Sequence, residues 1–237
     1  MAQMGLTYLC LGTLISYCVY VVRLIWILPF CKSDRDGFQD GIPLRSSSKG
    51  NGALNVFLFL GSGGHTGEMI RLLENYHQLL LANGNTLLVG YSDQNSRKSF
   101  EKLAAKRNLT CKIEYYEFIK AREVNASLVR SLVSVFHTLL DSCIKTIWIS
   151  LKFSRNPHLV LLNGPGTCCI LALWFKIIEW VNLVQPRTNI VYIESLARTS
   201  TLSLSGKILY RLADTFVVQW EELRAENPRA KHYGILV

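Results

Sequence analysis

The sequence predicts an α/β fold in which helices cover both faces of a parallel sheet, with one transmembrane helix ahead of it. Three observations support this prediction. After residue 52, short apolar runs alternate with longer segments of helical periodicity. Glycine-rich loops follow two of those apolar runs, at 61–67 and 163–167. An uncharged stretch, Met4–Val22, lies near the start of the chain.

Residues 4–30 are expected to form the membrane anchor. Apolar residues resume after Arg23, and a helix of about 20 residues crosses the hydrocarbon core. Basic residues follow this span but do not precede it, so the positive-inside rule places the N-terminus in the lumen and the body in the cytosol. The alternative is a cleaved signal peptide, for which a basic start and a small-residue cleavage site are missing.

The composition of the remaining chain indicates one globular domain. Residues 31–52 are polar and typical of a flexible linker, and residues 53–237 have the length of an ordinary domain. The net charge of +9 favours an anionic partner, such as phosphate groups or a membrane surface. Nucleic acid is not expected as a partner, because no basic run alternates with aromatic residues.

The cysteines and glycosylation sequons fit a cytosolic body. The seven cysteines match no metal-binding spacing, so we expect no metal site, and the cytosol would keep them reduced. The sequons at Asn108 and Asn125 would stay unmodified on the cytosolic side, which offers a test of the orientation.

Strands and helices alternate through the body. We expect strands at 55–60, 86–91, 112–117, 158–162, 189–193 and 215–219. We expect helices near 67–82, 94–107, 124–152, 167–183 and 205–213. In parallel sheets, ligands bind beyond the carboxyl ends of the strands, so the loops at 61–67, 163–167 and 194–198 should converge there.

The first glycine-rich loop is the leading candidate site. It reads Gly61-Ser62-Gly63-Gly64-His65-Thr66-Gly67 and joins a buried strand to a helix. Glycines let the backbone approach a ligand, and amides at a helix start favour an anion. His65 lies within reach of whatever the loop binds. The candidate substrate-binding residues are Gly61, Ser62, Gly63, Gly64, Thr66 and Gly67.

Three other interpretations of this loop have less support. A dinucleotide-binding fingerprint needs glycine where Thr66 stands, although Asp93 after the next strand would suit a ribose. A Walker A loop needs a lysine, which the turn lacks. The loop can also be a simple tight turn in which His65 caps the helix.

Two further loops are expected at the same edge. The loop at 163–167 offers backbone amides and a hydroxyl to phosphate oxygens, although an ordinary turn remains the alternative. Its candidate residues are Asn163, Gly164, Gly166 and Thr167. In the other, Glu194 ends a strand where a sugar hydroxyl or a helix amide would meet it. Arg198 is either a cation for a pyrophosphate or a solvated surface residue.

Two long segments, 128–153 and 170–184, are unusually apolar but contain charged residues. The charges argue against further membrane spans. We expect buried core helices, and the alternative is an apolar patch that faces the membrane.

Four segments resemble one known family. They are Phe59–Met69, Leu162–Cys168, Tyr192–Arg198 and the ending Tyr233–Val237. Together with the N-terminal span, they resemble the membrane-anchoring subunit of the eukaryotic UDP-N-acetylglucosamine transferase. That enzyme adds the second N-acetylglucosamine (GlcNAc) to the dolichol-linked oligosaccharide at the endoplasmic reticulum. The resemblance covers nearly the whole chain.

The resemblance implies a subunit of an inverting glycosyltransferase that is inactive alone. This chain would form a Rossmann-like sheet, the N-terminal acceptor-side half of a glycosyltransferase-B fold. A small soluble catalytic subunit would bind most of the donor, UDP-GlcNAc, and this chain would bind no cofactor or metal. The chain would recruit that subunit to the cytosolic face of the endoplasmic reticulum membrane. The docking segment would be Gly234, Ile235, Leu236 and Val237, for which a closing edge strand is the alternative.

Matched position by position, the resemblance also implies a mechanism. Dolichyl-diphosphate-GlcNAc would lie across the glycine loop, with its diphosphate near the loop amides and Arg198. His65 or Glu194 would deprotonate or orient the acceptor 4-hydroxyl. Two other functions stay open. One is a pure tether that contributes no active-site residue, and the other is a self-sufficient nucleotide-dependent membrane enzyme.

Overall fold

The computed structural model describes residues 2–27, 54–119, 128–153, 157–164, 166–182 and 188–237. The chain divides into two compact units, Met1–Pro43 and Leu44–Val237. The first unit contains helix α1 (Ala2–Ile27), and the expected linker at 31–52 lies outside the described residues. Within the described part of the chain, no helix combines the length and the apolar character that crossing a membrane requires. The membrane anchor at 4–30 stays a prediction.

The second unit alternates strands and helices, as the sequence predicts. Its strands are β1 (Asn55–Leu60), β2 (Thr86–Tyr91), β3 (Lys112–Glu117), β4 (His158–Asn163), β5 (Ile190–Ile193), β6 (Thr215–Val218) and β7 (Lys231–His232). Its helices are α2 (Gly64–Asn75), α3 (His77–Leu80), α4 (Gln94–Lys106), α5 (Leu128–Phe153), α6 (Gly166–Val181), α7 (Leu204–Leu212) and α8 (Glu221–Glu226). The short elements α3, α8 and β7 were not predicted separately, and α2 begins before the predicted residue 67.

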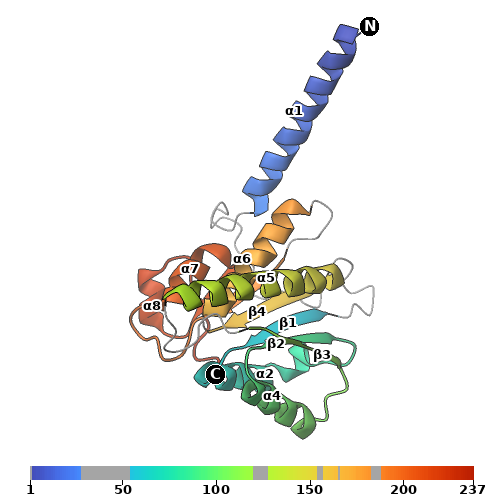
Figure 1. Cartoon of the computed structure of the whole chain (residues 1–237). Coiled ribbons are helices and arrows are strands. Elements are labelled where there is room, and N and C mark those ends of the chain that lie inside the picture. The colour runs from blue at the N-terminus through green and yellow to red at the C-terminus, as the bar shows by residue number, and fades with distance from the viewer. Residues whose placement is uncertain (1, 28–53, 120–127, 154–156, 165, 183–187) are drawn as a thin grey trace. The chain divides into compact units, whose positions relative to one another are not determined.

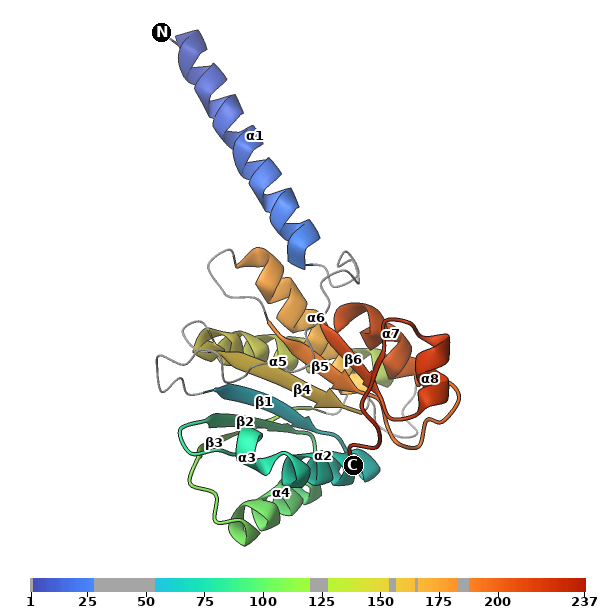
Figure 2. The same cartoon turned by 180° about the vertical axis from the view of Figure 1, so that it is seen from behind.

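The described strands form one parallel sheet in the order β3-β2-β1-β4-β5-β6-β7. This confirms the predicted α/β fold with a Rossmann-like parallel sheet. The chain builds outward from β1 to β3 and then returns to β4 on the other side of β1. Helices α2, α3 and α4 therefore cover one face, and α5 to α8 cover the other (Figures 1 and 2). The order reverses between β1 and β4, where parallel sheets of this type open a crevice for ligands.

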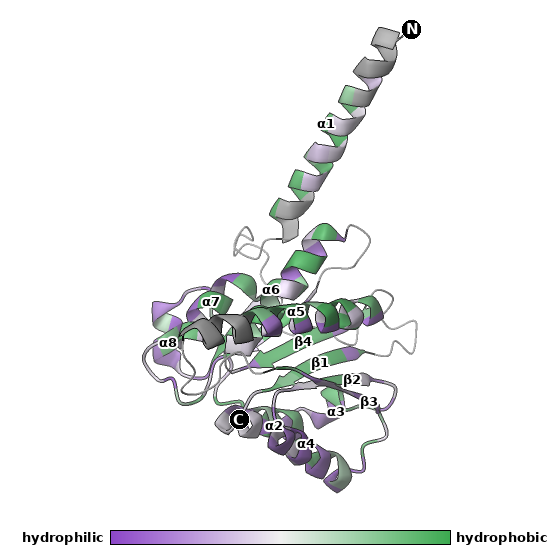
Figure 3. Ribbon diagram, in the orientation of Figure 1, coloured by the Kyte–Doolittle hydropathy of each residue, from purple (hydrophilic) through white to green (hydrophobic). Residues whose placement is uncertain are grey.

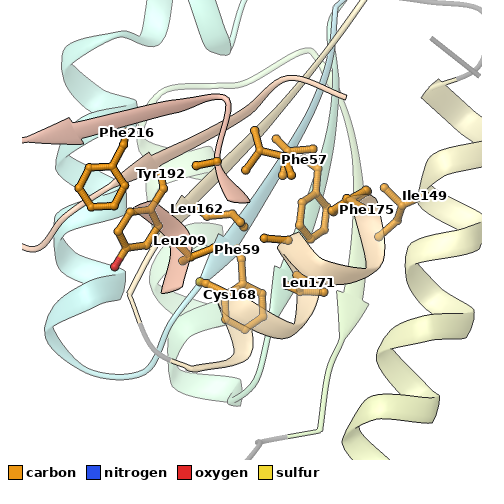
Figure 4. Packing of buried hydrophobic residues seen from close by; sticks show 14 of the residues in the cluster. Phe57, Phe59, Ile149, Leu162, Cys168, Leu171, Phe175, Tyr192, Leu209 and Phe216 are labelled. Carbon is orange, nitrogen blue, oxygen red and sulfur yellow. The ribbon is translucent and has the colours of Figure 1, made fainter. Parts of the chain in front are cut away.

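The core lies on both faces of β1, which explains its unbroken apolar sequence. Alternate residues of a strand point to opposite faces. Phe57 and Phe59 pack with Phe175 and other residues of the α5–α8 face, as Figure 4 shows. Val56 and Leu58 pack on the α2–α4 face. Figure 3 shows apolar residues along β1 and β4 at the centre of the sheet.

Helix α5 has an unusual distribution of residues. Its buried side chains include a row of small polar residues, Thr138, Ser142, Thr146 and Ser150. Its exposed side chains include Phe136, Leu140, Ile144, Ile147, Trp148 and Leu151. Helix α6 instead buries several of its apolar residues, among them Leu171, Ala172 and Phe175. The expectation of a buried core helix therefore fits α6, but α5 keeps a large apolar face exposed.

Candidate functional site

Three predicted loops meet at the carboxyl edge of the sheet. Because β1, β4 and β5 are neighbours and parallel, the loops that follow them begin side by side. Hydrogen bonds connect all three, from His65 and Glu68 to Asn163 and Ser195. The predicted convergence of the loops at 61–67, 163–167 and 194–198 is confirmed.

Glycine is required at two points of this edge. Gly63 precedes α2 with φ 64°, a left-handed conformation that favours glycine. No side chain caps α2, so the amides of its first turn are open to an anion. Gly164 has φ 116°, and a Cβ there would lie 2.7 Å from Cγ of His65. The missing side chain of Gly164 makes the space in which the His65 ring lies.

His65, Glu68 and Asn163 form a polar cluster across β1 and β4. The amide nitrogen Nδ2 of Asn163 donates to Oε2 of Glu68 at 2.9 Å and to the carbonyl oxygen of Ile193 at 3.3 Å. This orientation turns Oδ1 of Asn163 toward Nδ1 of His65, 3.2 Å away. Since Oδ1 only accepts hydrogen bonds, Nδ1 carries the proton and Nε2 holds the lone pair of a neutral ring. Nε2 of His65 is therefore the atom that can take up a proton.

Glu68 joins this cluster to the loop after β5. Its Oε1 accepts hydrogen bonds from the Ser195 hydroxyl at 2.7 Å and from Leu196 N–H at 3.2 Å. Its Oε2 lies 3.9 Å from Nδ1 of His65. One carboxylate thus contacts residues from all three loops. The sequence interpretation did not single out Glu68, although it lies three residues after His65.

The electrostatics of the pair favour a charged carboxylate beside the imidazole. The neighbouring Glu68 carboxylate raises the pKa of His65 above 6.5, against the opposing effect of burial. Burial alone would raise the pKa of Glu68, but the nearby His65 and hydrogen bonds from Ser195 and Asn163 outweigh it and lower that pKa. A base that is held by a carboxylate in this way is oriented and stabilised once it is protonated.

A pocket of about 530 Å³ opens beside the glycine loop, between the starts of α2 and α4. Several of its lining residues carry polar side chains. It is lined by Ser62, Gly63, Thr66, Gly67, Ile70, Asp93, Asn95, Ser96 and Ser99. Two of these residues bond inward, because the Thr66 hydroxyl donates to the carbonyl oxygen of Gly61 and its oxygen lies within hydrogen-bonding distance of Ser96 Oγ. Ser62, Gly63 and Gly67 are exposed, so the outer part of the loop remains accessible.

Glu194 lies at the predicted strand end but faces the protein. It is buried, and Oε1 accepts Ser195 N–H at 3.1 Å. Oε2 accepts from both the backbone and the hydroxyl of Ser203, the N-cap of α7, at 3.2 and 3.1 Å. A Cβ at Gly206 would lie 1.8 Å from the same oxygen. These contacts match the helix-amide alternative, while the catalytic role of Glu194 stays a prediction.

The other predicted residues differ in exposure. Gly166 begins α6 and is exposed, whereas Thr167 is buried. Arg198 is exposed, and its backbone N–H donates to the carbonyl oxygen of Ser195. Pro165 lies outside the described residues. Among the described residues, no group of three or more His, Cys, Asp or Glu side chains is arranged to hold a metal ion.

The predicted docking segment follows β7, the last strand in the order of the sheet. Leu236 is buried in the α2–α4 core, while Ile235 is exposed. The carbonyl oxygen of Leu236 accepts a hydrogen bond from Asn75 at 3.0 Å. Gly234 has φ 80°, and Val237 packs against the same core. Strand β7 ends at residue 232, so the segment is not an edge strand.

The comparison with protein families decides where this chain belongs. Residues 56–236 match the family model described as "Oligosaccharide biosynthesis protein Alg14 like". The chain belongs to the Alg14 family.

Curated Alg14 relatives match over the whole chain. A "UDP-N-acetylglucosamine transferase subunit ALG14" from Saccharomyces cerevisiae is 49% identical over 99% of this chain and 100% of its own length. The protein of the same name from Candida glabrata is 46% identical over 100% of both chains. Among solved structures, MurG of Acinetobacter baumannii gives a TM-score of 0.45 at 12% identity, over 70% of this chain and 41% of that one.

Proposed function

We propose that this chain is the membrane-bound, acceptor-side subunit of a UDP-GlcNAc transferase. The complex adds the second GlcNAc to dolichyl-diphosphate-GlcNAc at the cytosolic face of the endoplasmic reticulum. Membership of the Alg14 family supports this proposal, since curated members at 46% and 49% identity are named UDP-N-acetylglucosamine transferase subunits.

One observation carries the chemical part of the proposal, namely the orientation of His65 by Glu68 and Asn163. In an inverting transfer, the acceptor 4-hydroxyl attacks the anomeric carbon of GlcNAc as the bond to UDP breaks. The hydroxyl proton needs an acceptor, and Nε2 of His65 bears the lone pair for it. Glu68 then stabilises the imidazolium. This arrangement favours His65 over Glu194 as the base, because neighbouring donors already occupy both oxygens of Glu194.

The open first turn of α2 suits the diphosphate of the acceptor. Its amides are uncapped, and exposed Arg198 follows the neighbouring loop. The pocket beside Gly63 and Ser62 extends the same surface. In this proposal the donor UDP-GlcNAc is bound mainly by a small soluble catalytic subunit, and this chain binds no cofactor or metal of its own.

Membrane attachment is part of the proposal. Met4–Val22 lacks charged side chains, and α5 exposes a row of apolar residues including Phe136, Ile144 and Trp148. We expect α1 to be a single-pass anchor with a lumenal N-terminus, and the outer face of α5 to contact lipid. Extraction of the full chain by alkaline carbonate would argue against an integral anchor. Glycosylation at Asn108 would argue against a cytosolic body.

Recruitment of the soluble subunit is assigned to the C-terminal segment. It exposes Ile235, and the preceding Tyr233 is also exposed. Deleting Ile235–Val237 should abolish recovery of the partner, and unchanged recovery would contradict this assignment.

The deciding experiment measures transfer of radiolabelled GlcNAc from UDP-GlcNAc to a dolichyl-diphosphate-GlcNAc analogue. The full chain, the soluble subunit and the mixture are assayed separately. Activity only in the mixture supports a split enzyme. Activity of the soluble subunit alone would leave this chain as a tether, and activity of this chain alone would make it a self-sufficient enzyme.

A further inference from the structure

Two neighbouring residues after β6 hold the loop that contains Ser195. The side chain of Gln219 is 1% exposed, and its Nε2 donates to the carbonyl oxygen of Glu194 at 3.0 Å. Nε1 of Trp220 donates to the carbonyl oxygen of Leu196 at 2.7 Å. These two carbonyls flank Ser195. Side chains from one short segment therefore fix the backbone on both sides of Ser195.

Gln219 also holds the C-terminal segment. Its Oε1, the other polar atom of the same amide, accepts a hydrogen bond from Leu236 N–H at 3.2 Å. Only one orientation of the amide satisfies both neighbours, because a backbone N–H can only donate and the carbonyl oxygen of Glu194 can only accept. One buried side chain thus connects the end of the chain to the site loop.

The connection continues to the proposed base. The loop that Gln219 holds supplies the Ser195 hydroxyl and Leu196 N–H to Glu68, and Glu68 lies beside His65. Asn163 donates to Glu68 and accepts from His65, so a hydrogen-bonded path runs from Leu236 to the imidazole.

We propose that Gln219 is a positioning residue that couples partner docking to the site. A partner on the C-terminal segment fixes Leu236 and, through Gln219, the loop at 194–198, which keeps Glu68 in place behind His65. This inference rests on the proposed function, since it takes the C-terminal segment as the docking site of the soluble subunit. It also gives a physical reason why the assembled complex would be more active than its separated parts, because ordering one end of a hydrogen-bonded path lowers the cost of ordering the other.

Hydrogen exchange of backbone amides tests the coupling. The full chain is measured in detergent, with and without the soluble subunit. The informative loop amides are those of Leu196, Ala197 and Arg198, which bond to Glu68 Oε1, to Ser195 Oγ and to the Ser195 carbonyl oxygen. We expect the partner to slow exchange both in the C-terminal segment and at these loop amides. Slowing in the C-terminal segment alone overturns the coupling, and this result needs no variant.

Two variants separate coupling from loop packing. Gln219→Met keeps the volume of the side chain but removes both hydrogen bonds. Trp220→Phe removes the hydrogen bond from Trp220 to the same loop. It leaves the hydrogen bond between Gln219 and Leu236 in place. We expect Gln219→Met to abolish the partner-induced slowing in the loop and to keep it in the C-terminal segment. Trp220→Phe should keep both. Equal slowing in Gln219→Met and the wild type overturns the proposal.

Transfer kinetics give a second readout. In the assembled complex, Gln219→Met should lower kcat about tenfold, because it disturbs the orientation of the base. The KM for UDP-GlcNAc should stay unchanged, because the partner binds the donor. A rise in that KM with kcat unchanged contradicts a positioning role. If the wild-type C-terminal segment gains no protection while the partner is bound, the docking assignment fails together with the coupling, but the three-way transfer assay still tests the split enzyme.

Discussion

Replacing Glu68 with glutamine should impair the base without removing it. In the structure, Oε1 of Glu68 accepts two hydrogen bonds from the Ser195–Leu196 segment, and a glutamine carbonyl can keep both. The new NH₂ group would then take the place of Oε2. There it would meet Nδ2 of Asn163, which is now 2.9 Å from Oε2, and the protonated Nδ1 of His65. Donors would face donors at both contacts.

The magnitude follows from these lost contacts. Removing a charged acceptor from a buried hydrogen bond costs about 1.5–3 kcal/mol. A general base contributes about 10²–10⁴ in rate, and Glu68 acts through His65, so its loss should cost no more than that. We expect Glu68→Gln to lower kcat about 10²-fold in the complex. Partner recovery should be unchanged, because the glutamine carbonyl keeps the two hydrogen bonds with the Ser195–Leu196 segment.

The pH dependence gives a sharper signature. His65 acts as a base only when it is neutral, so activity rises as pH increases through its pKa. The Glu68 carboxylate, whose Oε2 lies 3.9 Å from Nδ1, is the largest cause that raises this pKa above 6.5. Glu68→Gln should therefore shift the rising limb of the kcat/KM profile to lower pH. The assay is radiolabel transfer by the assembled complex across the pH range that brackets 6.5.

A matched control lies on the same helix. Glu74 pairs with Lys106 at 3.1 Å on the surface, so Glu74→Gln removes the same charge from α2 away from the site. This control should change neither kcat nor the rising limb of the kcat/KM profile. If Glu68→Gln behaves like Glu74→Gln, the assignment of Glu68 as the partner of His65 is refuted.

Three further predictions address neighbouring features. Gly164→Ala should destabilise the fold by about 1–3 kcal/mol and lower transfer, because its Cβ would lie 2.7 Å from His65 Cγ; thermal unfolding and the transfer assay measure both effects. Glu194→Gln should lower the midpoint of thermal unfolding and keep the rising limb of the pH profile, moved slightly to lower pH because Glu194 also raises the pKa of His65; loss of the limb would instead support Glu194 as the base. Lys176→Met should cost about 3–5 kcal/mol in denaturant unfolding, because Lys176 is buried and its Nζ lies 2.9 Å from Asp214 Oδ2; a loss below 1 kcal/mol would contradict this.

Much of the fold could be predicted from the sequence because its strands are short, apolar and separated by turn residues. The strands β1, β2 and β3 begin and end at the predicted residues. The convergence of three loops followed from the parallel sheet alone, since parallel strands end at one edge. Helix α8 and strand β7 were not predicted, because six and two residues are too few to show a periodic pattern.

The candidate site was only partly predictable, for physical reasons. Glu68 was missed because the helix was expected to start at residue 67. The helix begins at Gly64, so His65 and Glu68 lie three residues apart on one helical face. The sequence also could not show that Glu194 faces Ser203, which follows it across a loop. The role of Gln219 depends on contacts with two distant segments and has no local pattern.

The central claim is that this chain supplies the base of a split active site. Transfer by the assembled complex with His65→Ala tests it most directly, after equal recovery of the soluble subunit has been shown. We expect kcat to fall by about 10²–10⁴, with partial recovery on addition of imidazole. Transfer within a few-fold of the wild type would contradict it, and would leave this chain to bind and recruit without taking part in the chemistry.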